Sequence, residues 1–194
     1  MNKTDGMKYF KMVDAGLDVS PLVNALHNNP MLWDAMNLRT THPMTPHKQA
    51  SDIVIRFNKL TDDPLDVIDD NDCYWYPATS MLPVLPYIYH LQSLVMGDRI
   101  GRSVITRLHP NKMIEPHIDQ GSPVSYYQRF HLCLQNVIGS KFIIGDESFE
   151  PIAGDLFIVA NQIPHWVDNA SDTDRLTLII DIHTPMFQDV KATL

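Results

Sequence analysis

Apolar positions along the chain change their spacing near residue 100. In the first half, Ser20 and Pro21 open an apolar stretch, and both residue types are typical of the start of a helix. A second apolar stretch, from Leu82 to Met96, predicts another helix, with Gly97 as the residue that ends it. The β-branched segment from Ser51 to Phe57 predicts a strand between these helices.

Five short β-rich segments follow, and turn-forming residues separate them. They span residues 101–108, 127–136, 140–146, 154–161 and 175–183. Strands at this spacing predict an antiparallel sandwich or barrel, and helices followed by strands predict an α+β fold with helices covering one face of the sheets. We expect a single domain over residues 1–194, with a mainly helical lead-in over 1–98 and a strand-rich core over 99–185.

The formal net charge of −8 narrows the classes of partner. An acidic chain without a run of Lys or Arg does not attract phosphate backbones, so nucleic acid is not an expected partner. The sequence shows neither an apolar signal segment nor a stretch long enough for a membrane helix, and Cys73 and Cys133 lack the spacing of a zinc ribbon or redox pair. These features predict a cytoplasmic protein. The aspartate-rich stretch from Thr61 to Asp72 predicts a solvated loop.

Three residues form a candidate metal site. His117 and Asp119 stand two residues apart, and on an extended segment both side chains project from the same face. His165 lies just after the predicted strand 154–161, where a side chain can point into a cavity. Two His and one carboxylate bind non-haem Fe(II) and leave coordination positions open, whereas a structural zinc site is closed by four protein ligands. HxD pairs also occur by chance and a single His is usually structural, so the prediction depends on companion residues.

Companion residues suit 2-oxoglutarate. Arg175 begins an apolar strand, where a buried guanidinium is costly unless it meets an anion. Its planar fork suits the distal carboxylate of 2-oxoglutarate, while Thr177 on the same strand face and Thr106 are candidate hydroxyl contacts. Arg129 and His131 share one face of their predicted strand, opposite an apolar face. The functional interpretation places both in the cavity; the structural alternative is a surface salt bridge for Arg129 and a core hydrogen bond for His131.

The stretch from about Gly101 to Pro185 resembles the aspartyl/asparaginyl β-hydroxylase branch of the Fe(II)/2-oxoglutarate oxygenases. The residues that carry the resemblance are RLHPNKMIEPHID, RFHLCL and FIIGDESFEPIAGDLFIVANQIPHWVDNASDTDRLTLIIDIHTP. The resemblance implies a double-stranded β-helix (jelly-roll, cupin-like) core with covering helices before it. It also assigns the iron to His117 and His165, 2-oxoglutarate to Arg175, Arg129 and His131, and a hydroxyl position to Thr106.

Two positions depart from the family. The best-known animal members lack the carboxylate ligand that Asp119 provides, so this chain resembles bacterial or viral relatives with a complete triad, and a peptide Asp or Asn substrate is not implied. Asn111 stands where the family often has Gly after the Pro of a turn, and Asn tolerates a positive φ better than most residues.

These residues together predict a 2-oxoglutarate-dependent dioxygenase that uses Fe(II) and O₂. Such an enzyme hydroxylates an unactivated C–H of a small molecule, amino acid or peptide side chain, and releases succinate and CO₂. The alternatives are a cupin-like metal enzyme that does not use 2-oxoglutarate, a non-catalytic jelly-roll binding module, and a fold in which His117 and His165 never meet.

Aromatic and His residues near the predicted core are candidate substrate contacts, although each also has a core or surface interpretation. They are Trp75, Tyr76, Tyr126, Tyr127, Trp166 and His183. His109 and His183 are also candidates for orienting the metal ligands.

Overall fold

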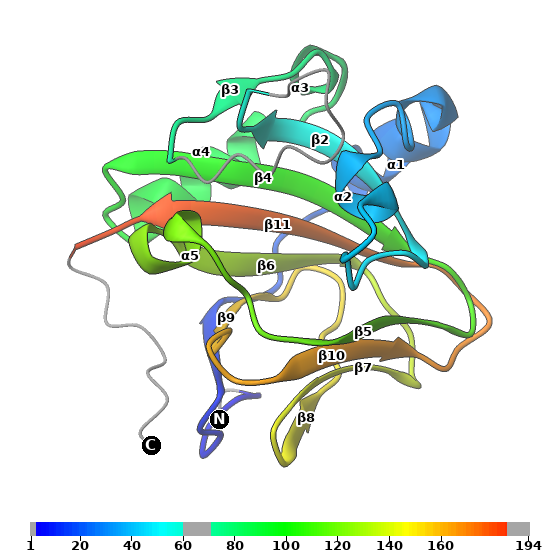
Figure 1. The fold of residues 1–194 in the computed structure, drawn as a ribbon, viewed down its shortest axis with the longest axis vertical. Helices are drawn as coiled ribbons and strands as arrows, with labels where there is room; N and C mark the ends of the chain where they lie inside the picture. Colours follow the sequence, from blue (N-terminus) through cyan, green and yellow to red (C-terminus); the bar gives the residue numbers. More distant parts are fainter. Residues whose placement is uncertain (1–2, 60–70, 186–194) are drawn as a thin grey trace.

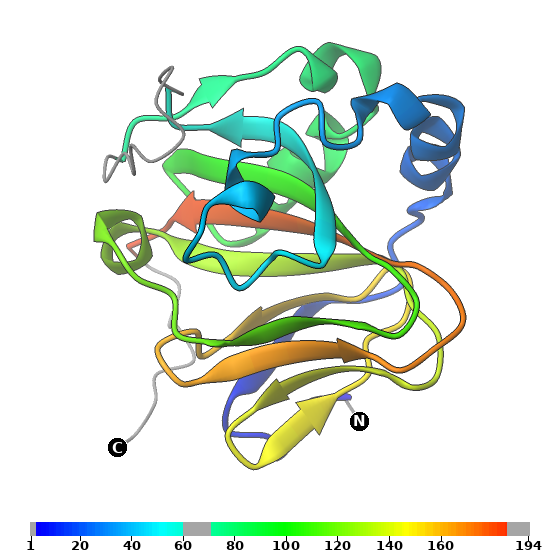
Figure 2. The same cartoon turned by 45° about the vertical axis from the view of Figure 1, so that its right-hand side comes forward.

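Two antiparallel β-sheets face each other across the middle of the molecule (Figures 1 and 2). The structure, a computed structural model, describes residues 3–59 and 71–185. Within these ranges the larger sheet has the order β1 (Phe10–Asp14), β9 (Leu156–Val159), β6 (Gln128–Gln135), β11 (Arg175–His183), β4 (Arg99–Leu108), β2 (Ala50–Phe57) and β3 (Tyr74–Trp75). The smaller sheet has the order β5 (Lys112–His117), β10 (His165–Asn169), β7 (Ser140–Ile144) and β8 (Glu147–Phe149).

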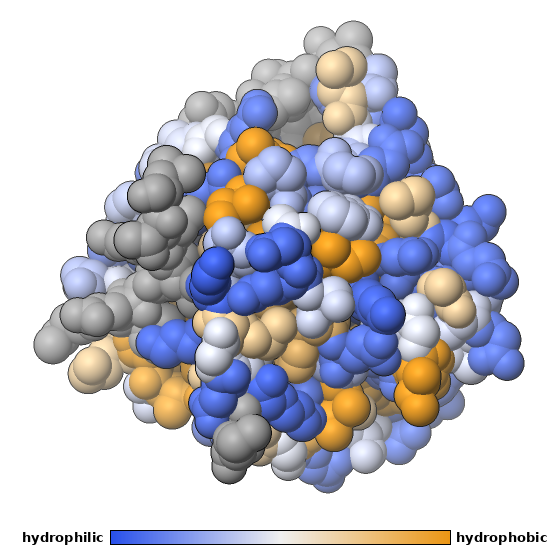
Figure 3. Space-filling view, turned by 90° about the horizontal axis from the view of Figure 1, so that it is seen from below, coloured by the Kyte–Doolittle hydropathy of each residue, from blue (hydrophilic) through white to orange (hydrophobic). Residues whose placement is uncertain are grey.

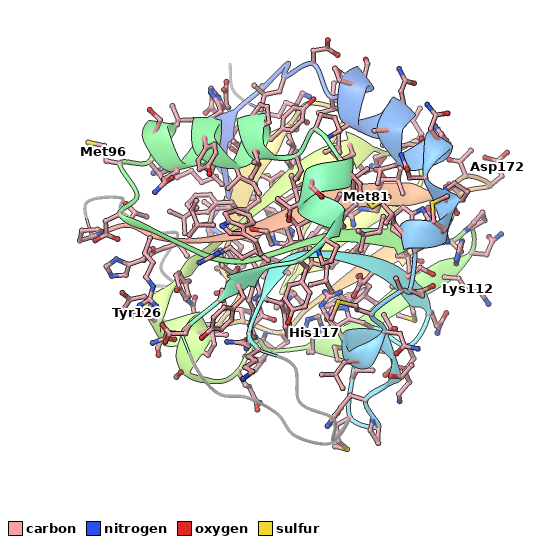
Figure 4. The ribbon with its side chains drawn as sticks, turned by 90° about the horizontal axis from the view of Figure 1, so that it is seen from above. Met81, Met96, Lys112, His117, Tyr126 and Asp172 are labelled. Atoms are coloured by element: carbon pink, nitrogen blue, oxygen red, sulfur yellow. The ribbon has the colours of Figure 1, made fainter. Side chains whose placement is uncertain are left out.

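Helices cover the face of the larger sheet that points away from the smaller one, as the order of elements predicted (Figure 4). Leu26 of α1 (Ser20–Asn28) and Leu91 of α4 (Leu85–Leu94) join one buried cluster with Phe130 of the sheet. The remaining helical segments are η1 (Pro30–Leu32), α2 (Leu38–Thr41), α3 (Ala78–Met81) and α5 (Ser122–Tyr126). Burial of this apolar layer supplies most of the driving force for folding on this side of the sheet.

Side-chain alternation along β6 and β11 separates this core from the space between the sheets. On β6, Phe130 belongs to the helix-covered core, while Arg129 and His131 line cavities between the sheets, as predicted. On β11 the same alternation places Arg175 and Thr177 in the cavity lining. The two central strands of the larger sheet therefore carry polar groups on one face only.

A second apolar cluster lies between the sheets and borders the polar residues. Four phenylalanine rings pack against one another, and the centroids of neighbouring rings lie 5.2–6.3 Å apart. They belong to Phe10, Phe142, Phe149 and Phe157. Phe142 also lies 5.2 Å from the ring of His131. This aromatic cluster fixes the separation of the sheets and forms an apolar floor beneath the polar cavity.

The region before residue 98 contributes strands as well as helices. β1 pairs with β9, β2 pairs with β4, and β3 pairs with β2, so the larger sheet extends beyond the predicted strand-rich core on both sides. Only β2 was predicted, as Ser51 to Phe57. The single apolar run in the short segment Phe10–Asp14 is too brief to identify a strand without its partner β9.

Helix ends differ from the predicted ones. Ser20 occupies the first turn of α1 and is not its N-cap; its backbone N–H donates to the carboxylate of Asp18 at 3.0 Å. The helix predicted from Leu82 begins instead at Leu85, because Pro86 fits only the first turn. Met96, and not Gly97, adopts the left-handed conformation after α4, with φ 53°.

Three strands of the smaller sheet were not predicted as such: β5, β8 and β10. β5 contains His117 near its end, and β10 begins at His165, which the sequence placed after a strand and not at the start of one. Gly121 leads into α5, whereas the turn at Asn111 is confirmed and has φ 56°. Of the predicted aspartate-rich loop, Thr61 to Asp72, residues 61–70 lie outside the described residues.

The surface on the side of the smaller sheet mixes polar and apolar groups. Figure 3 shows hydrophilic residues there, interrupted by separate small apolar areas. Among residues 3–59 and 71–185, none of the helices combines the length and apolar character that crossing a membrane requires.

Candidate metal centre

The three predicted metal ligands converge at one end of the space between the sheets. His117 and His165 are direct cross-strand partners in β5 and β10. Their Nε2 atoms lie 3.6 Å and 3.9 Å from Oδ1 of Asp119, and all three candidate ligand atoms lie within 4.8 Å of one another. Figure 4 labels His117 in the interior of the molecule. The alternative in which the two His residues never meet is therefore wrong.

Backbone carbonyls fix the orientation of both imidazoles. Nδ1 of His117 lies 2.7 Å from the carbonyl oxygen of Glu115, and Nδ1 of His165 lies 2.9 Å from that of Ile163. A carbonyl only accepts, so each Nδ1 carries a proton, and in the neutral ring the lone pair is on Nε2, where it is available to a metal. Burial and the nearby His165 lower the pKa of His117, which favours this neutral form.

Asp119 is held through one carboxylate oxygen. Arg129 and Asn161 donate to Oδ2 at 2.9 Å and 3.1 Å, while Oδ1 faces the two imidazoles. Burial raises the pKa of this carboxyl, but Arg129 and the two imidazoles outweigh burial and hold it at about 2. Asp119 is thus ionised at neutral pH and presents a single oxygen to the position that the two Nε2 atoms share.

A buried guanidinium lies in the same cavity. Arg175 is 3% exposed, and its Nε and Nη2 have no hydrogen-bond partner among the described residues. Oγ1 of Thr177 and Nε2 of His131 are also buried without a partner there, and all three residues line the inner pocket that contains the triad. Burial lowers the pKa of Arg175. A buried cation and two polar groups without partners fit a carboxylate ligand, because leaving such groups unpaired is costly.

Two predicted co-substrate contacts already have protein partners. Arg129 pairs with Asp119 and, through Nε and Nη2, with both carboxylate oxygens of Asp181 at 2.8 Å and 2.9 Å. Thr106 pairs with Thr177 across the strands, but its hydroxyl donates to Asp52 at 2.7 Å. Their contact with 2-oxoglutarate stays a prediction.

Sequence reasoning missed Arg39 and His47, which line the inner pocket beside the triad. Arg39 donates to Asp52 at 2.5 Å and to Thr106 at 3.2 Å. Its Nη2 lies 3.3 Å from Nδ1 of His47, and since Arg only donates, neutral His47 carries its proton on Nε2. The ring of His47 stands edge-on to that of His117 at 5.3 Å. Arg39 lies in the short helix α2 and His47 in the connection after it, and neither has a spacing in the sequence that signals a site.

A sequence profile of the aspartyl/asparaginyl beta-hydroxylase family matches residues 72–185, which is more than half of the chain. The chain belongs to this family. The match confirms the resemblance seen in the sequence, and it identifies the protein as a 2-oxoglutarate-dependent hydroxylase. The comparison with curated proteins finds no match.

Solved structures similar to this hydroxylase share its fold. A prolyl-4-hydroxylase from Pseudomonas putida aligns with a TM-score of 0.56 at 10% identity, over 93% of this chain and 95% of that chain. A 2OG-Fe(II) oxygenase family protein from Burkholderia pseudomallei aligns with a TM-score of 0.52 at 16% identity, over 80% and 79%. At these identities the likeness concerns the fold, and it confirms the predicted double-stranded β-helix core.

A larger chamber adjoins the inner pocket of the hydroxylase. It has a volume of about 380 Å³ and shares Asp119, Arg129 and His47 with the inner pocket. Its walls are mainly apolar, with Phe57 and Ile179 among them, and the polar lining residues include Asn58 and Arg102. Asp119 therefore lines both spaces, whereas His117, His165 and Arg175 line the inner pocket alone.

None of the aromatic and His residues predicted as substrate contacts or orienting groups lines either space. They are Trp75, Tyr76, Tyr126, Tyr127, Trp166, His109 and His183. Tyr126 stacks on His183 at 4.3 Å, at the periphery of Figure 4, and His183 also pairs with Asp98. His109 pairs with Asp174 at 3.0 Å. Tyr127 is buried outside both spaces, and its position, like those of the others, is a feature that residue type alone does not reveal.

Proposed function

We propose that the hydroxylase binds Fe(II) through His117, Asp119 and His165, and 2-oxoglutarate against Arg175. It uses O₂ to hydroxylate an unactivated C–H of an amino acid, small molecule or peptide side chain, and releases succinate and CO₂. One observation supports this most strongly: a converged triad shares a cavity with a buried guanidinium that has no anionic partner among the described residues.

The metal ligands have roles that follow from their contacts. His117 and His165 offer Nε2 because their Nδ1–H groups are held by backbone carbonyls. Asp119 offers one oxygen because Arg129 and Asn161 hold the other. Three protein ligands leave room for further ligands on an octahedral ion, as a non-haem Fe(II) oxygenase needs. When bound, the iron and 2-oxoglutarate supply the oxidising chemistry that turns a C–H group into an alcohol.

Arg175 orients 2-oxoglutarate by its distal carboxylate. Its guanidinium offers Nε and Nη2 as parallel donors, and Thr177 adds a hydroxyl on the same strand face. His131 is the third buried polar residue of the inner pocket that has atoms without a partner in the described part of the chain, and its ring stacks on Phe157 at 5.4 Å. Burial of these groups excludes water, which strengthens their interaction with an anion.

The wider chamber receives the substrate. Its volume of about 380 Å³ suits a molecule of amino-acid size, and it reaches the triad at Asp119. Apolar walls exclude water from the group to be oxidised, while Asn58 and Arg102 on the chamber wall offer polar contacts for orientation. A cupin-like enzyme without 2-oxoglutarate would leave the buried charge of Arg175 without a ligand, so we favour the oxygenase.

Substitution of Arg175 tests the co-substrate assignment. Succinate formation from 2-oxoglutarate is measured with Fe(II) and O₂ against a panel of free amino acids and short peptides, with mass spectrometry for a gain of one oxygen. Because two charge-assisted hydrogen bonds are lost, Arg175→Met is expected to raise the KM for 2-oxoglutarate by about 100-fold or more.

Arg107→Met is the matched control. Arg107 lies on neighbouring β4, packs 4.3 Å over Trp33 and lines neither space, so its loss is expected to leave the KM unchanged. If Arg175→Met turned over 2-oxoglutarate with the wild-type KM, the co-substrate assignment would be wrong, and the cupin-like alternative would be favoured.

A further inference from the structure

A buried carboxylate on the wall of the wider chamber, Asp181, is connected to the triad through one guanidinium. Asp181 is 2% exposed and is the direct cross-strand partner of Arg129 in β11 and β6. Arg129 donates through Nε and Nη2 to both oxygens of Asp181 and through Nη1 to Asp119. The three side chains form an unbroken series, Asp181–Arg129–Asp119, that ends on a candidate metal ligand.

The charges of Asp181, Arg129 and Asp119 affect how strongly the triad attracts a cation. With neutral imidazoles, the negative charge of Asp119 is cancelled by the positive charge of Arg129, which lies 2.9 Å away. A triad with no net charge attracts a divalent cation poorly, because burial strengthens repulsion by the guanidinium. Asp181 gives the series Asp181–Arg129–Asp119 one net negative charge, and the other pair nearby, Arg39 with Asp52, is neutral. The positive charge of Arg175 in the same pocket is the one that the carboxylate of the proposed co-substrate offsets.

Among the residues that the structure describes, Asp181 has no charged partner other than Arg129. Both of its carboxylate oxygens are occupied by Arg129, and no other ion pair includes it there. Asn161 independently holds Oδ2 of Asp119 at 3.1 Å. The orientation of Asp119 is therefore supported twice, whereas the charge of Arg129 is compensated on its far side by Asp181 alone.

We propose that Asp181 is a positioning residue for the metal: it offsets the charge of Arg129 so that Asp119 can bind a divalent cation while its second oxygen is held. This proposal rests on the proposed function, since it requires the metal at the triad. It also assigns Arg129 a role toward the ligand Asp119 in addition to any contact with 2-oxoglutarate. The competing explanation is that the series only stabilises the fold.

Titration of the metal-free protein with Mn(II), followed by the loss of the free-ion EPR signal, tests the proposal. Asp181→Asn keeps the shape and removes the charge, and it is expected to weaken Mn(II) binding by about 10- to 100-fold. The double variant Asp181→Asn with Arg129→Gln removes both charges. It is expected to recover most of the lost affinity, since Asp119 then faces no uncompensated guanidinium.

Asp155→Asn is the matched control, because Asp155 is also a buried, ion-paired carboxylate but contacts Lys3 and lines neither space. It is expected to bind Mn(II) like the wild type. The proposal is wrong if Asp181→Asn binds Mn(II) like the wild type, or if the double variant binds no more tightly than Asp181→Asn alone.

Two further variants, Arg129→Gln and His165→Ala, distinguish the remaining outcomes. If Asp181→Asn fails to fold by circular dichroism, Arg129→Gln alone decides: the proposal requires it to bind Mn(II) at least as tightly as the wild type, and weaker binding overturns it. Failure of the proposed function looks different, because the wild type would then bind no Mn(II), or His165→Ala would bind it equally well.

Discussion

His131 illustrates how a single buried imidazole couples the site to pH. It stacks on Phe157 at 5.4 Å and stands edge-on to Phe142, with little solvent contact that would accommodate a charge. Burial, with Arg129 and Arg175 nearby, lowers its pKa well below the usual value for His. The native protein therefore keeps His131 neutral, and an ionised form would be opposed by both guanidinium groups.

Acid should destabilise the metal-free protein through this residue. The unfolded chain takes up a proton at His131 near pH 6.5, and the native state excludes it until a lower pH. Stability present above pH 6.5 is thus lost as the pH falls, at up to ~1.4 kcal/mol per pH unit for one excluded proton. His131→Gln is expected to show a smaller fall in melting temperature between pH 7 and pH 5 than the wild type, measured with a chelator present.

His27→Gln is the control for that comparison, because His27 is exposed on α1. Its melting temperature should follow the wild-type dependence on pH. An equal fall in the His131→Gln variant would contradict the assignment of His131 as a neutral buried group. Some dependence should persist in His131→Gln, since burial and Arg39 also lower the pKa of His47.

At the residue scale, the sequence identified the groups whose type and spacing are distinctive. His117 and Asp119 share a short extended segment, and Arg175 opens a strand in which a cation is unusual. Arg39 and His47 could not be found in this way, because their approach to the triad depends on how α2 and the segment after it fold over the sheet. No local pattern encodes that path.

At the scale of one element, the C-terminus of α4 has a favourable pattern of backbone hydrogen bonds but an unfavourable residue, Met96, in the left-handed position. The N–H groups of Met96 and Gly97 donate to the carbonyls of Ser93 and Gln92 at 3.2 Å and 2.8 Å, which is a Schellman motif. The left-handed position belongs to Met96, with φ 53°, and a side chain there is strained. Gly97 is required for a different reason: an added Cβ would lie 2.3 Å from Cγ2 of Ile182.

Met96→Gly is expected to raise the free energy of unfolding by about 1 kcal/mol. Met96 is 61% exposed, so little packing is lost when its side chain is removed. Denaturant unfolding measures the change, and Gly97→Ala serves as the contrasting variant that should destabilise the protein. A Met96→Gly variant less stable than the wild type would show that relief of the left-handed strain does not outweigh the lost contacts of the Met96 side chain.

This helix end also shows why element boundaries were predicted less well than elements. The sequence indicated a glycine at the end of α4, which is correct, but the motif is shifted by one residue because Ile182 leaves no space for a side chain at position 97. Likewise, Pro86 delays the start of α4 to Leu85. Tertiary packing and proline position, and not helix propensity, decide both ends.

For the whole molecule, the predicted α+β arrangement is confirmed because the strand-rich segments in the second half are long and apolar enough to stand out. β5 and β10 escaped prediction because their polar residues face the site, which breaks the apolar alternation that identifies strands. β1 was missed because its pairing with β9 joins segments almost 150 residues apart. Functional residues and long-range pairing thus account for the differences.

Two adjoining spaces, with Asp119 on the wall of both and with His117 and His165 on the wall of the inner one, form the arrangement from which the proposed activity follows. The most direct test is an anaerobic titration of the Fe(II)-loaded protein with 2-oxoglutarate, followed by visible absorption. Binding of the co-substrate to iron in the triad should produce a weak charge-transfer band in the wild type and none in Asp119→Ala or His165→Ala. A folded wild-type protein without the band, or a band of equal strength in both variants, would contradict the proposed iron site.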